Sequence, residues 1–131
     1  MGTTSHHHDI IGNKQDETRE WGFFDPGFNC KMKISAGGKL NAKIIVVIKE
    51  VKNTNLIIYE MPNSFSESYG THGILENNRI YTDVKSGKHM APSDWSIWLV
   101  FNPKFGGGYV KFEHWVDNYD ESDVNSLNGE W

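Results

Sequence analysis

The sequence has a single cysteine, Cys30, among 131 residues. One thiol excludes both an intramolecular disulfide and a zinc site built from cysteines. No apolar run approaches the roughly 18 residues of a membrane-spanning helix, and residues 1–20 lack the basic start and apolar core of a signal peptide. We therefore expect a domain that folds without disulfides and without a membrane span, and its compartment stays open.

The sequence also has no cluster of lysine and arginine, the pattern that indicates a nucleic-acid-binding surface. The net charge is −4 and is unevenly placed. Residues 117–131 carry five acidic residues and no basic one, whereas residues 21–116 are mildly basic. We therefore expect no nucleic-acid partner and a solvated acidic C-terminal tail over residues 117–131.

Residues 1–20 have few apolar side chains and no periodicity, so we expect a polar arm or an expression leader. This segment contains the run His6-His7-His8. The first interpretation of the run is a remnant of a purification tag, and the second is a solvated tail. A metal site comes third, because three consecutive histidines cannot all face one ion without a partner from elsewhere.

From Trp21 onward, short apolar segments are separated by turn signals. One set of side chains alternates with polar residues, as in a half-buried strand: Phe28, Cys30, Met32 and Ile34. Residues 39–51 have an apolar centre at 44–48, which predicts a central strand covered on both faces. The polar residues 52–55 predict a hairpin between this strand and a strand at 56–61.

The remaining strands are predicted at 73–75, 79–84, 94–102 and 109–116. Residues 63–73 and 85–93 are expected to be loops, and the glycine-rich residues 105–108 a hairpin or bulge turn. The pattern predicts one β-sandwich over residues 21–116, jelly-roll or immunoglobulin-like, or a small barrel. It would contain about seven to eight mainly antiparallel strands.

No catalytic residue can be assigned from the pattern. The Gly-x-Ser-x-Gly motif of a serine nucleophile is absent, and nothing singles out a pair of acidic residues. His72 and His89 are expected on loops, and His114 is expected to be a hydrogen-bonded residue of the core or the sheet, because it alternates with apolar side chains. A small enzyme using loop histidines is the lesser alternative.

No cofactor or metal is assigned either. The acidic stretch 117–123 offers the oxygen ligands that calcium prefers. Its spacing does not fit an EF-hand, since Tyr119 falls on a ligand position and the required glycine is missing. Calcium binding is therefore the weaker alternative to a solvated tail.

Aromatic residues make up 13% of the chain and carry the functional prediction. Aromatic rings on an exposed sheet stack on sugars or fill a protein interface. The candidate ligand-binding residues are Trp98, Tyr109 and Trp115 on strands, with Tyr69 and His72 on a loop.

We therefore expect a non-enzymatic binding module, carbohydrate-binding or lectin-like, in which Asn and Asp side chains hydrogen-bond to the sugar. The alternative is a structural self-assembly subunit, such as a virion decoration or filament protein, that docks through its terminal arms. The expected partner is thus a carbohydrate or a protein, including a second copy of the chain.

Overall fold

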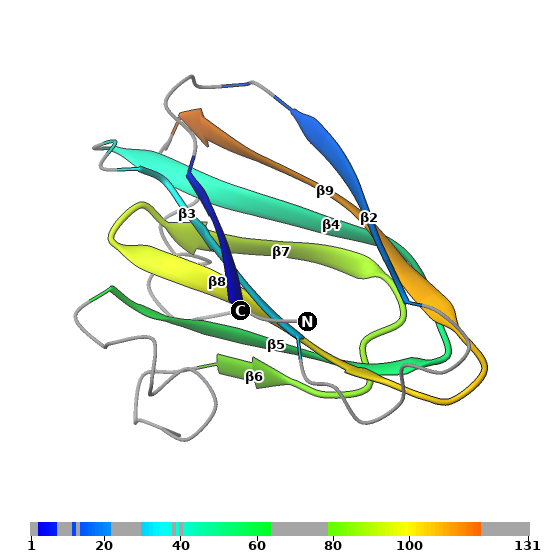
Figure 1. Ribbon diagram of the computed structural model, residues 1–131. Helices are drawn as coiled ribbons and strands as arrows, with labels where there is room; N and C mark the ends of the chain where they lie inside the picture. Colours follow the sequence, from blue (N-terminus) through cyan, green and yellow to red (C-terminus); the bar gives the residue numbers. More distant parts are fainter. Residues whose placement is uncertain are drawn as a thin grey trace.

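The computed structural model describes residues 3–7, 12, 14–21, 30–37, 39, 41–63 and 79–118. All regular structure in these residues is β-strand, which confirms the predicted all-β class. Two sheets pack against each other as a β-sandwich (Figure 1). The described residues contain no helix long and apolar enough to cross a membrane.

The two sheets contain nine strands in the described part of the chain. The first sheet has five, in the order β1 (Thr3–His7), β3 (Cys30–Ser35), β8 (Trp95–Pro103), β5 (Thr54–Pro62) and β6 (Arg79–Tyr81). The second sheet has four, in the order β2 (Gln15–Trp21), β9 (Gly108–Asn118), β4 (Ala42–Lys52) and β7 (Gly87–Pro92). The pair β1–β3 is parallel and the other pairs are antiparallel.

The pairing from β2 to β9 is nested. β2 pairs with β9, β3 with β8, β4 with β7 and β5 with β6. Apart from β5 and β6, consecutive strands of this series lie in different sheets. Nested strand pairs that form two four-stranded layers are the topology of a jelly roll. Of the two predicted sandwich types, jelly-roll and immunoglobulin-like, the strand order therefore matches the jelly roll. β1 is an additional strand at the edge of the first sheet.

The hairpin predicted at residues 52–55 is wrong, because β4 and β5 lie in different sheets. Asn53 makes this crossing with a φ of 58°. Its side-chain amide donates to the carbonyl oxygens of Phe105 (2.9 Å) and Gly107 (2.7 Å), in the turn between β8 and β9. That turn also crosses between the sheets and is not a hairpin. Alternation shows which face a residue occupies but not which strand pairs with which.

The core lies between the sheets. β4 confirms the predicted central strand: it lies between β9 and β7, and Ile44, Ile45, Val46 and Ile48 are buried. On β3 the predicted alternation holds, since Met32 and Ile34 are fully buried. The side chain of Cys30 lies outside the described residues, as do residues 73–75.

Three strands, β1, β2 and β7, lie where the sequence predicted no strand. β1 and β2 come from the segment expected to be a polar arm, and both are edge strands whose pairing depends on backbone hydrogen bonds. The loop predicted at residues 85–93 is wrong over Gly87–Pro92, which is β7. The sequence of β7 shows no clear apolar alternation, because it contains glycine, lysine and proline. In the structure His89 and Ala91 pair with Val46 and Ile44, so they lie on the core-facing side of the sheet. The predicted division into arm, domain and tail stays a prediction.

Candidate functional site

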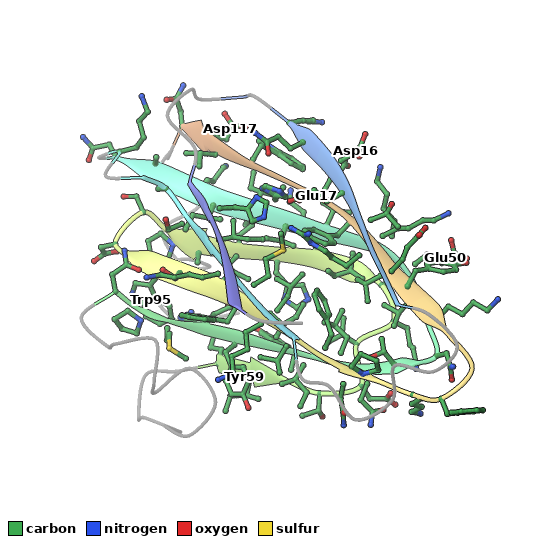
Figure 2. The ribbon with its side chains drawn as sticks, viewed as in Figure 1. Asp16, Glu17, Glu50, Tyr59, Trp95 and Asp117 are labelled. Atoms are coloured by element: carbon green, nitrogen blue, oxygen red, sulfur yellow. The ribbon has the colours of Figure 1, made fainter. Side chains whose placement is uncertain are left out.

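Polar side chains lie between the sheets at one edge of the sandwich, where β1 and β2 are outermost. We call His6, Glu17, Arg19 and His114 the β1–β2 cluster. His114 shares the inner face of β9 with the core residues Val110, Phe112 and Val116. On β2, Asp16 points outward and Glu17 inward, as Figure 2 shows.

The carboxylate of Glu17 is the centre of this cluster. Its Oε2 contacts Nε2 of His114 and lies 3.4 Å from Nδ1 of His6. Its other oxygen, Oε1, accepts a 3.3 Å hydrogen bond from Arg19, and Nη2 of Arg19 also lies 3.0 Å from Nε2 of His6. His114 is completely buried and hydrogen-bonded, as the sequence predicted.

The charges in the cluster favour the ionised form of Glu17. Burial acts to raise the pKa of Glu17, but the hydrogen bond and charge of His114, with His6 and Arg19, outweigh it and hold the pKa below its usual value. The result is a carboxylate flanked by two imidazole rings at a half-buried position. These three groups are all possible metal ligands, and their ligand atoms lie within 4.8 Å of one another.

A second polar cluster lies at the opposite edge, where β6 and β7 are outermost. We call Glu60, Arg79, Tyr81 and His89 the β6–β7 cluster. Nδ1 of His89 lies 3.1 Å from Oε2 of Glu60, and Arg79 lies 3.8 Å from Oε1. The Tyr81 ring meets the His89 ring edge-on, with centroids 4.7 Å apart.

Glu60 is 1% exposed, and its Oε1 has no hydrogen-bond partner. Burial raises the pKa of Glu60, against the opposing effects of His89 and Arg79. A carboxylate on Nδ1 fixes the ring of His89 in one orientation, which is the arrangement that prepares a histidine as a general base. Among the described residues no Ser, Thr or Cys side chain is hydrogen-bonded to His89.

The structure does not bring the predicted ligand-binding aromatic residues together. Trp98 lies on β8 of the first sheet, whereas Tyr109 and Trp115 lie on β9 of the second. Trp98 is 2% exposed and Trp115 is 9% exposed, although both alternate with core residues and so point to the outer faces. Tyr69 and His72 lie outside the described residues, and the binding role of the five residues stays a prediction.

Tyr109 is the one of the three strand aromatics that remains substantially accessible. Its hydroxyl donates a 2.7 Å hydrogen bond to Glu50, and the ammonium groups of Lys111 and Lys52 lie 5.0 and 5.9 Å from its ring centroid. Figure 2 shows Glu50 at the end of the sandwich where β9 begins. At the same end the turn between β8 and β9 presents Phe105, which is 57% exposed. We call Glu50, Lys52, Phe105, Tyr109 and Lys111 the Tyr109 patch.

Sequence reasoning missed the acidic and basic residues of both clusters. For Glu60 a signal was present, because it continues the alternation of Leu56 and Ile58 and therefore faces the core. Glu17 and Arg19 had no such signal, since no apolar residue between 14 and 20 marks the inner face of β2. His89 was singled out, but its partner Glu60 was not.

Comparison of the chain with protein-family models, with curated proteins and with solved structures finds no match.

Proposed function

We propose that the protein is a non-enzymatic binding module that binds carbohydrate through the Tyr109 patch. The observation that supports this most strongly is the exposure of Phe105 on the same end of the sandwich as the accessible Tyr109. Accessible aromatic side chains that lie together on one surface are typical of a site that binds a ligand or a partner.

The chemistry of the patch suits a sugar. Aromatic faces stack on the C–H faces of a sugar ring, and a carboxylate and two ammonium groups hydrogen-bond its hydroxyls. Glu50 accepts from Tyr109 and lies 3.7 Å from Lys111, so its oxygens are held beside the ring. The exposed amide side chain of Asn55 follows the crossing at Asn53, and amides also pair with sugar hydroxyls.

A glycan array followed by titration of the best sugar tests this proposal. We expect Tyr109→Ala and Phe105→Ala each to weaken binding at least ten-fold. Tyr59→Ala is the matched control, because Tyr59 is also a half-exposed strand tyrosine but lies on β5 of the first sheet. The proposal is overturned if no glycan binds, or if the control variant loses as much affinity as Tyr109→Ala.

One observation favours the second candidate, a self-assembly subunit. β1 comes from the N-terminal segment and adds to the first sheet as an outermost strand, paired with β3. An edge strand of this kind can be supplied equally well by a second copy of the chain. Light scattering at high concentration should then show a dimer or larger species, and a strict monomer contradicts this candidate.

A further inference from the structure

We propose that His6, Glu17 and His114 form a binding site for a divalent transition-metal ion of the zinc class. From the sequence alone a metal site was the third interpretation of His6-His7-His8, because the run needs a partner from elsewhere in the chain. The fold supplies two such partners, Glu17 from β2 and His114 from β9. This site is independent of the Tyr109 patch.

One of the three pairs of ligand atoms already has the spacing that such an ion requires. A tetrahedral zinc ion with bonds of about 2.0 Å to nitrogen and oxygen holds its ligand atoms about 3.3 Å apart. Nδ1 of His6 lies 3.4 Å from Oε2 of Glu17, so these two atoms already have this separation. Nε2 of His114 is in direct contact with the same oxygen, so these two atoms have to separate to the ligand–ligand distance when the ion enters.

The donor set selects the class of ion. Two imidazole nitrogens and one carboxylate oxygen suit zinc and its neighbours, whereas calcium and magnesium prefer oxygen alone. Three protein ligands leave a fourth position for water or another small ligand, as in open zinc sites. His6 and Glu17 are partly exposed and His114 is buried, so the site is reached from the edge of the sandwich.

Arg19 orients the carboxylate. Its hydrogen bond to Oε1 of Glu17 leaves Oε2 for the ion. In the ion-free form Arg19 also donates to Nε2 of His6, which places the ring proton on Nδ1. When Nδ1 binds the ion, that proton is lost to solvent and Nε2 takes one up, so Arg19 releases Nε2 and keeps Glu17.

The position of the site gives it a structural consequence. His6 belongs to β1 in the first sheet, whereas Glu17 and His114 belong to the second. A bound ion therefore ties the outermost strand of one sheet to the other sheet. An ion that binds only the folded state raises the free energy of unfolding by RT ln(1 + c/Kd), where c is the free ion concentration, so the gain grows with the logarithm of c relative to Kd.

Calorimetric titration with zinc chloride tests the proposal on the whole chain. We expect one saturable ion per chain, with affinity lowered at least ten-fold by His6→Ala and by Glu17→Gln. His7→Ala is the matched control, since His7 is the next histidine of the same run and the proposed site does not include it. It should keep the wild-type affinity.

Equal losses in His6→Ala and His7→Ala would indicate an adventitious ion only, bound by the histidine run, and would overturn the proposal. Absence of saturable binding would also overturn it. Replacement of the buried His114 can impair folding, so its contribution is tested in the wild-type protein by cobalt(II) absorption. Tetrahedral coordination by His, His and Glu predicts an intense visible band that zinc removes, and an octahedral spectrum contradicts the assigned ligand set.

Discussion

Nδ1 of His89 lies 3.1 Å from Oε2 of Glu60, and this contact joins β7 of the second sheet to β5 of the first. At the opposite edge His6 of the first sheet meets Glu17 of the second. Both open edges of the sandwich are therefore bridged by a histidine and a glutamate.

Replacing His89 with alanine should destabilise the protein strongly. The substitution leaves the buried carboxylate of Glu60 without its nearest partner, and breaking a buried pair in this way costs about 3 kcal/mol. Urea unfolding at pH 7 measures the loss. Lys88→Ala, at the exposed neighbouring position, should change stability by less than about 0.5 kcal/mol. Equal, small effects in both variants would contradict the bridge.

The pH dependence of stability should change in Glu60→Gln. Burial raises the folded-state pKa of Glu60 above 4.5, so the folded protein holds this proton more tightly than the unfolded chain does. The resulting stabilisation is complete below pH about 4.5 and is lost as the pH rises through the folded-state pKa.

Glutamine carries no such proton, so the stability of Glu60→Gln relative to the wild type should increase from pH 4 to pH 7. Unfolding free energies across this range measure the effect. Parallel curves for the two proteins would show that the pKa of Glu60 is not raised by folding.

Asn53 should tolerate glycine better than alanine. Its φ of 58° lies in the left-handed region, which costs an alanine roughly 1–2 kcal/mol. Both variants also lose the amide that donates to the turn between β8 and β9. We expect a loss of about 2 kcal/mol for Asn53→Ala and about half of that for Asn53→Gly. An alanine variant as stable as the wild type would contradict this crossing.

Truncation to alanine should cost much more stability at Trp98 than at Phe105. Trp98 is buried although it faces away from the core, so Trp98→Ala should cost about 3 kcal/mol or more. Phe105 is the exposed large apolar residue of the described chain, and Phe105→Ala should change stability by less than about 0.5 kcal/mol. A small loss for Trp98→Ala would mean that the outer face of the first sheet is open there.

Hydrophobic alternation predicted the sandwich correctly, because a period of two assigns side chains such as Met32, Ile34, Phe112 and His114 to the inner face whatever the pairing. It could not predict that the turns at Asn53 and Phe105 cross between sheets, since that depends on contacts between the two turns. Alternation also could not predict that His6 lies close to His114. The two residues are far apart in sequence, and their proximity depends on how β1 and β2 pair with the sheets.

The most direct test of the metal site is the nitrogen-15 spectrum of the histidine side chains, recorded before and after one equivalent of zinc. We expect zinc to shift the signals of Nδ1 of His6 and Nε2 of His114. The signals of His89, which pairs with Glu60 at the other edge, should not change. Zinc-induced shifts confined to His7 and His8, or no shift at His114, would contradict it.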